Sequence, residues 1–172
     1  MEAHIGVNSA NELYLDVTTG KEIGIDEESF NALKAAMDHT NARLRSGEIK
    51  LSDVHFSTKG PKVLDNNVFT IASCAGTTAA YLYWWGYQFY MDECLTQQVE
   101  GLLYMGAGVS TIAAALSVPF GQVEVTIILG LAAGLMGLGG GYLQYIDGGG
   151  GNQGIIVDYN WFYNDITWVG HQ

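Results

Sequence analysis

The side chains that most often perform chemistry are scattered along this chain. His4, His39, His55 and His171 show neither an HExxH pattern nor the Cys and His spacing of a zinc site. Gly149, Gly151 and Gly154 match the pattern G-x-G-x-x-G. A dinucleotide site needs a strand before this pattern and a helix after it, whereas here a helical pattern precedes and a strand pattern follows. A phosphate-binding loop is also excluded, because no Lys occurs after position 62.

Asp92 and Glu93 are adjacent carboxylates that could contact a cation. The pattern of an EF-hand is absent around them, and we interpret the pair as a solvated turn. No candidate nucleophile is spaced with a base. We therefore predict that the chain is not an enzyme and has no catalytic residue, cofactor, metal or small-molecule substrate.

Charge is distributed very unevenly along the sequence. Lys and Arg number 7 against 18 Asp and Glu, a net charge of −11, which excludes nucleic acid as a partner because phosphate binding requires clustered basic residues. All the basic residues lie at or before Lys62, after which the composition becomes aromatic and glycine-rich. We place a domain boundary near residues 57–66. It separates an N-terminal module at 1–62, a candidate pro-region, from a hydrophobic domain at 63–172.

The two cysteines, Cys74 and Cys94, flank an aromatic segment. They could form one disulfide in an oxidising compartment, and the alternative is a pair of buried free thiols. The N-terminal residues contain no apolar run of signal-peptide length. Either the chain is not exported by that route, or the sequence begins after the signal.

The N-terminal module has the pattern of a small α+β unit. Alternating apolar residues over 11–25, with a turn at Thr19-Gly20, predict a β-hairpin. Asp26 is a candidate N-cap for a helix over 27–46, and Gly47 is a plausible stop. A short strand is predicted within 49–56.

Aromatic residues dominate the start of the second domain. A strand is predicted over 68–73, and a single long strand over 81–91. The odd positions of the long strand form one apolar face, which is more typical of a core or an interface than of a ligand site. The aromatic residues of this face are Tyr81, Tyr83, Trp85, Tyr87 and Phe89.

Residues 99–146 are almost free of charge and predict two helices, about 97–117 and 123–145, joined by a tight turn. Glycines at helical spacing on the second helix predict close packing against the first, where the facing stripe is Gly108, Thr111 or Ile112, and Ala115. These packing glycines are Gly130, Gly134, Gly137 and Gly141. The helical hairpin is either buried in the soluble form or able to insert into a membrane. A C-terminal β-hairpin over 155–169 completes an α+β fold.

The order of these features resembles small secreted proteins of Gram-positive bacteria that are described as bacteriocin-like. The resemblance rests on Cys74-Ala75-Gly76, Trp84-Trp85-Gly86, Cys94, the Gly/Ala-rich helices and the aromatic strands that end at Gln172. It implies export, a disulfide and action on membranes or cell surfaces. Many membrane-active bacteriocins are cationic, and this chain departs from them because its second domain has no positive side chain after Lys62.

Two functions follow from the sequence. The first is a secreted, bacteriocin-like protein whose helical hairpin acts on a target membrane. The alternative is a structural subunit of an extracellular filament, surface layer or virion, which assembles through its aromatic strands because edge lysines do not block strand pairing. Both hypotheses place the protein outside the cell. Self-association is expected, and size in solution separates the two functions, because a monodisperse monomer favours the first and a polymer favours the second.

Overall fold

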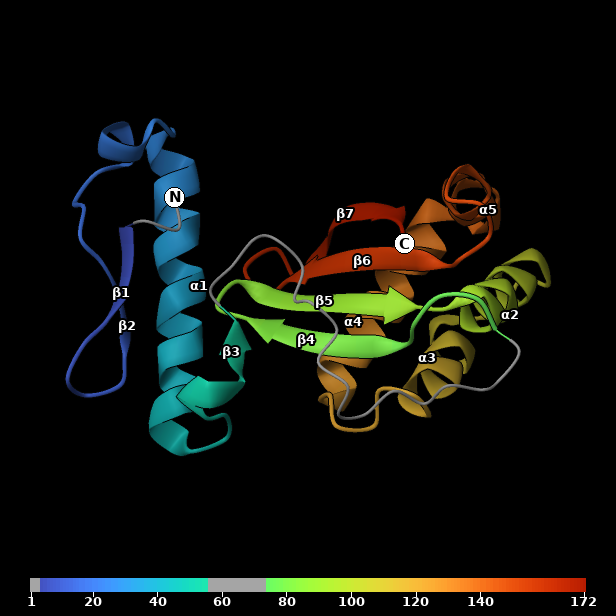
Figure 1. Ribbon diagram of the computed structural model, residues 1–172, viewed down its shortest axis with the longest axis horizontal. Helices are drawn as coiled ribbons and strands as arrows, with labels where there is room; N and C mark the ends of the chain where they lie inside the picture. Colours follow the sequence, from blue (N-terminus) through green and yellow to red (C-terminus); the bar gives the residue numbers. More distant parts are fainter. Residues whose placement is uncertain (1–3, 56–73) are drawn as a thin grey trace. The chain divides into compact units, whose positions relative to one another are not determined.

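The computed structural model describes residues 4–55 and 74–172, and it has an α+β fold (Figure 1). The chain divides into two compact units. Of the described residues, unit 1 comprises 4–55 with 81–86, and unit 2 comprises 74–80 with 87–172. The domain boundary predicted at 57–66 and the strand predicted at 68–73 lie outside the described residues.

The β-hairpin of unit 1 differs from the predicted one. Strand β1, Ile5–Val7, pairs antiparallel with β2, Leu13–Leu15, so β2 pairs with a preceding segment and not a following one. Residues Gly20–Ile23 form a 3₁₀ helix. The carboxylate of Glu22 accepts hydrogen bonds from the N–H groups of Thr18 and Thr19 at 3.1 and 2.9 Å, which caps a helical turn where we predicted a strand.

The predicted helix over 27–46 is confirmed as α1, Glu27–Ser46. Asp26 is its N-cap and accepts a hydrogen bond from the Ser29 N–H at 2.8 Å. Gly47 ends the helix with a φ of 75°, the left-handed conformation that favours glycine. The apolar stripe of Phe30, Leu33 and Met37 is buried.

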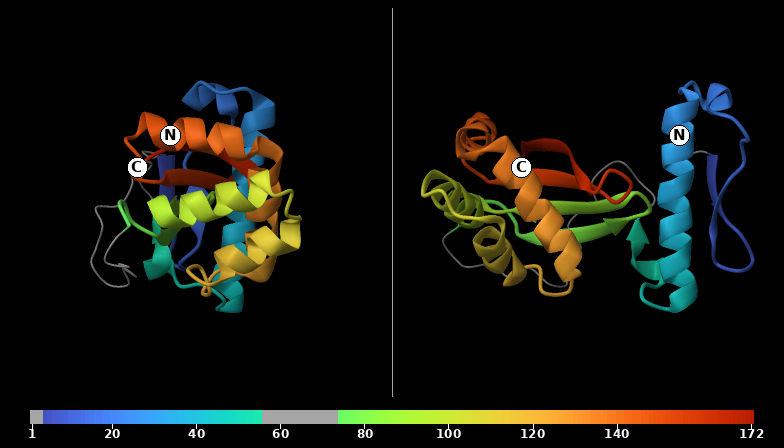
Figure 2. Two further views of the ribbon diagram at one scale, coloured as in Figure 1. Left: turned by 90° about the vertical axis from the view of Figure 1, so that its right-hand side faces the viewer. Right: turned by 180° about the vertical axis from the view of Figure 1, so that it is seen from behind.

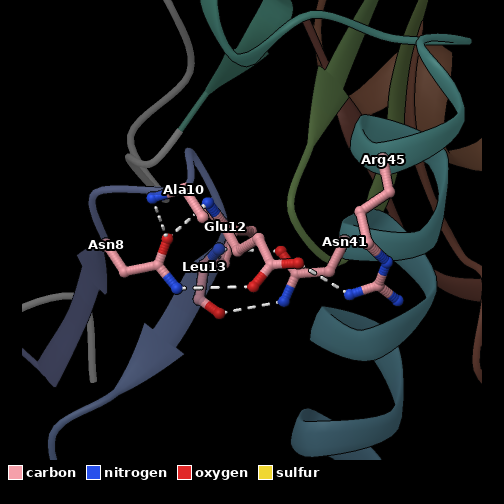
Figure 3. A network of polar contacts seen from close by, with 6 residues as sticks. All are labelled: Asn8, Ala10, Glu12, Leu13, Asn41 and Arg45. Carbon is pink, nitrogen blue, oxygen red and sulfur yellow. Dashed lines mark hydrogen bonds and ion pairs between the residues drawn. The ribbon is translucent and has the colours of Figure 1, made fainter.

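Polar contacts join α1 to the β1–β2 hairpin (Figure 3). The Asn41 side chain accepts from the Leu13 N–H at 2.7 Å and donates to the Leu13 carbonyl at 2.9 Å. One turn later, Arg45 forms an ion pair with Glu12 at 2.8 Å. Asn41 thus satisfies both backbone groups of a buried strand residue, which fixes the position of β2 along the helix.

The aromatic segment at 81–91 is a pair of strands, and the prediction of one long strand is wrong. Strand β4, Ala79–Tyr83, and strand β5, Gly86–Met91, are separated by a turn at Trp84-Trp85. Strand β3, Val54–His55, pairs parallel with β4 and is shorter than the strand predicted within 49–56. The Thr40 hydroxyl of α1 donates to the Trp84 carbonyl at 2.7 Å, which holds the turn within unit 1.

The predicted C-terminal hairpin is confirmed. Strand β6, Ile155–Asn160, pairs antiparallel with β7, Asp165–His171. The register shifts between Asp158 and Tyr159, which leaves Thr167 as an extra residue in β7. The strand order of the larger sheet is β3-β4-β5-β6-β7.

Four helices stand where two were predicted. They are α2, Glu93–Tyr104; α3, Val109–Ser117; α4, Val125–Leu138; and α5, Gly140–Gly149. The first predicted helix is broken near Gly106 and the second at Gly139, whose φ angles are 72° and 82°. The broken halves still pack in pairs, α3 against α4 and α2 against α5.

The core of unit 2 lies between its helices and strands β5 and β6. In Figure 2, α4 crosses one face of the strands of unit 2, and α2, α3 and α5 gather at one end of these strands. Phe89 of β5 contacts Phe120, with ring centroids 5.1 Å apart, and both side chains are fully buried. Each helix α3, α4 and α5 adds buried aliphatic side chains, among them Ile112, Leu116, Ile128, Leu131, Leu135 and Leu143.

Candidate functional site

Helix α4 is apolar around its whole circumference. Its inner face buries Ile128, Leu131 and Leu135. Its outer face carries Val125, Leu129, Ala133 and Met136, which lie one above another at helical spacing and are all exposed. No charged residue interrupts α4. We call these four outer residues the α4 stripe. A surface helix normally presents polar residues to water, so this stripe indicates a contact surface.

Further exposed apolar side chains lie on the neighbouring pair of helices. Tyr104 and Met105, at the end of α2, are 62% and 76% exposed, and Tyr145 of α5 is 76% exposed. The Tyr104 hydroxyl donates to the Gln144 side chain of α5 at 3.0 Å. The aromatic rings are therefore presented to solvent at the contact between α2 and α5.

Two glycines of α4, Gly130 and Gly134, pack against strands and not against the first predicted helix. A Cβ on Gly130 would lie 2.2 Å from the Tyr159 hydroxyl oxygen of β6, and one on Gly134 would lie 2.8 Å from Ile166 of β7. A Cβ on Gly137 would meet nothing within 4 Å. A Cβ on Gly141 would lie 3.7 Å from the Tyr104 hydroxyl oxygen. The predicted glycine face against residues 108–115 is thus wrong, because the side of α4 that bears Gly130 and Gly134 receives the C-terminal hairpin.

The predicted aromatic face is divided between the two units. Tyr83 and Trp85 stack at 5.1 Å in unit 1, where His55 also contacts Tyr81 at 5.7 Å. Tyr87 and Phe89 contact each other at 5.6 Å in unit 2. Tyr83, Tyr87 and Phe89 are each at most 7% exposed. These rings build the cores of this chain and are not available to another one.

The disulfide between Cys74 and Cys94 is present, with Cα atoms 5.5 Å apart. It joins the segment before β4 to the first turn of α2. The Glu93 N–H donates to the Ala75 carbonyl at 2.9 Å beside it. The side chain of Gln172 reaches the same segment, accepting from the Thr77 N–H at 2.8 Å and donating to the Thr77 carbonyl at 2.9 Å. The bridge and the C-terminal residue together fasten the start of unit 2.

Three electrostatically interacting carboxyl groups lie on helices α2 and α5, which pack against each other, and the sequence did not reveal this cluster. Glu93 and Glu100 lie on α2, and Asp147 lies on α5. Glu100 is 7% exposed and Asp147 is 4% exposed. One carboxylate oxygen of Glu93 and one of Glu100 are buried without a hydrogen-bond partner. The solvated turn predicted at Asp92-Glu93 is wrong, because Asp92 is buried and caps α2 by accepting from the Leu95 N–H at 2.9 Å.

The surroundings of Glu93 and Glu100 favour the protonated forms of these two groups. Burial raises the pKa of Glu100 to about 7, and the negative charges of Asp147 and Glu93 add to the rise. Burial is also the largest cause that raises the pKa of Glu93, followed by its hydrogen bond with Asp147. Among the described residues, no group of three or more His, Cys, Asp or Glu has the arrangement to hold a metal ion.

No single helix within the described ranges is long and apolar enough to cross a membrane alone. Helices α4 and α5 together meet the requirements of length and composition, but the chain bends by 88° between them.

No family model, no curated protein and no solved structure matches this chain.

Proposed function

We propose that this chain is a secreted, bacteriocin-like protein that contacts membranes through the outer surface of helices α4 and α5. The observation that carries the proposal is the α4 stripe. Val125 is 69% exposed, Met136 44% and Leu129 40%, on a helix without any charge. Burying an aliphatic side chain of this size is worth about 1.5–3 kcal/mol, so several of them together favour an apolar medium over water.

Two further features support this proposal. Tyr142 and Tyr145 are exposed on α5, and tyrosine is enriched where a membrane meets water because its ring is apolar and its hydroxyl is polar. The disulfide supports an oxidising compartment, such as the exterior of a cell. The resemblance in the order of sequence features agrees with such a location.

The alternative, assembly through the aromatic strands, receives less support from the structure. Most rings of the predicted aromatic face are buried within the chain. Strand β7, at the end of the strand order, carries the extra residue Thr167. An irregularity of this kind on an edge strand hinders the addition of another strand.

The test is sedimentation of the full chain with phosphatidylcholine vesicles. We expect Leu129→Asp to lower vesicle binding by about tenfold or more, because a charge replaces an apolar side chain in the α4 stripe. The matched control is Ser110→Asp on α3, which adds the same charge at an exposed position outside the stripe. Equal loss in both variants, or no binding by the wild-type chain, would contradict the proposal.

A further inference from the structure

The contact between α2 and α5 contains more negative charge than the described residues around it compensate. Glu93 and Glu100 are two turns apart on α2, and the negative charge of Asp147, on α5, acts on both of them. The Asp147 carboxylate accepts a hydrogen bond from the Gly154 N–H at 2.7 Å. Glu100 has a buried oxygen without a hydrogen-bond partner. An ionised carboxylate that is buried with an unpaired oxygen and without a neighbouring positive charge is strongly disfavoured, so this packing favours a protonated Glu100.

The described part of unit 2 contains no Lys or Arg that could neutralise the cluster. Lys and Arg are absent from the sequence after Lys62. Helix α3, which also packs against α2, has no ionisable residue. Asp92, at the N-terminus of α2, adds another negative charge that repels Glu93. The ionisable groups on α5 and on the strands packed against it are Tyr142, Tyr145, Asp147, Asp158, Tyr159, Asp165 and His171.

We propose that the α2–α5 contact is a proton-dependent clamp, which is closed while the buried carboxyl group of Glu100 retains its proton and opens when that group ionises. Opening separates α5 from α2 and relieves the burial of the carboxylates. The rest of unit 2 is held by the α3–α4 pair and the β6–β7 hairpin, where the described residues form no such cluster. The device belongs to the chain itself and does not depend on membrane contact.

The direction of the pH dependence follows from the protons bound in each state. The pKa of Glu100 is raised from 4.5 in the unfolded chain to about 7 in the folded one, so the folded state binds more protons between these values. The stability of the contact is therefore greatest below pH 4.5 and is lost as the pH rises through about 7.

Amide hydrogen exchange of the full chain, without vesicles, tests the clamp. Exchange rates are converted to protection factors, which removes the intrinsic effect of pH on exchange. We expect the protection of α5 to fall by about tenfold or more between about pH 5 and about pH 8. The protection of α1, which lies in unit 1, should stay constant over the same range. A constant protection of α5 in the wild-type chain would overturn the proposal.

Substitutions identify the group responsible. Glu100→Gln should keep α5 protected up to about pH 8, since the amide cannot ionise. Glu124→Gln, which removes an exposed carboxylate before α4, should show the same fall in α5 protection as the wild type.

If Glu100→Gln fails to fold, Asp147→Asn provides a second test, because its amide oxygen can still accept from Gly154. Carbon-13 NMR titration should then show a lower pKa for Glu100 in Asp147→Asn than in the wild type. An unchanged pKa of Glu100, or a wild-type fall in Glu100→Gln, would contradict the clamp.

Discussion

At the scale of single residues, what surrounds a glycine in space decides its role. Gly130 and Gly137 occupy the same helix, and both have ordinary helical backbone. Gly130 faces Tyr159, whose ring is 1% exposed and whose hydroxyl donates to Asn164 at 2.6 Å. Gly137 faces open space. Spacing along the helix could predict that glycines gather on one side, but not which element covers that side.

Gly130→Ala and Gly137→Ala form a matched pair with opposite expected effects. Gly130→Ala should lower the free energy of unfolding by about 1–3 kcal/mol, because the new methyl group overlaps the Tyr159 hydroxyl. Gly137→Ala should be neutral or stabilising by up to about 1 kcal/mol, because alanine favours the helix and nothing obstructs it. Urea denaturation measures both. A larger loss in Gly137→Ala than in Gly130→Ala would refute this placement of α4.

At the scale of elements, local signals predicted the helix and strand positions best where caps and turns are encoded nearby. Asp26 and Gly47 marked both ends of α1. The break in the aromatic segment was missed because a turn of two residues, Trp84-Trp85, leaves the alternation of apolar residues uninterrupted. The break at Gly139 was missed because a single glycine is tolerated inside many helices.

The carboxyl cluster at α2–α5 was beyond the reach of the sequence for a related reason. Glu93 and Glu100 share a face of α2, whereas Asp147 lies on α5, which bends by 88° from α4 at the break near Gly139 and packs against α2. A continuous helix over 123–145 would have ended before Asp147. Tertiary packing, and not sequence spacing, created this part of the molecule.

The disulfide makes a prediction at the scale of elements. It joins two residues that are 20 positions apart in the sequence, and the loop that it closes contains β4, β5 and the start of α2. Replacing both Cys74 and Cys94 by Ser should lower the free energy of unfolding of unit 2 by about 3 kcal/mol, because the unfolded chain gains conformational freedom. The wild-type chain after reduction should have the same urea midpoint as the double variant. Intact mass before and after reduction and alkylation checks that the bridge forms.

At the scale of the whole molecule, the separation of charge between the units matters most. The basic residues are confined to the N-terminal part, where Arg43 pairs with Glu48 at 2.7 Å and Arg45 pairs with Glu12 at 2.8 Å. Among Asp, Glu, Lys, Arg and His, the described part of unit 2 has only acidic residues and one His near its C-terminal end. A membrane-contacting surface on this unit must therefore act through apolar contact and not through attraction to anionic lipid.

This charge distribution predicts an unusual lipid preference. Vesicles that contain phosphatidylglycerol should bind the chain more weakly than pure phosphatidylcholine vesicles, because negative charges repel. Added salt should screen the repulsion and raise binding to the anionic vesicles. Sedimentation at low and high ionic strength measures both effects. Stronger binding to anionic vesicles at low salt would show that the basic residues of unit 1, and not the α4 stripe, make the contact.

The most direct test of the proposed function locates the α4 stripe on the membrane. An environment-sensitive fluorophore is attached to Met136→Cys in the stripe, or to Ser110→Cys on α3, while Cys74 and Cys94 remain bridged. On addition of phosphatidylcholine vesicles, we expect a blue shift and increased emission from position 136, because the probe enters an apolar medium. The probe at position 110 should keep its emission in water. An unchanged spectrum at position 136, or equal shifts at both positions, would contradict membrane contact through α4.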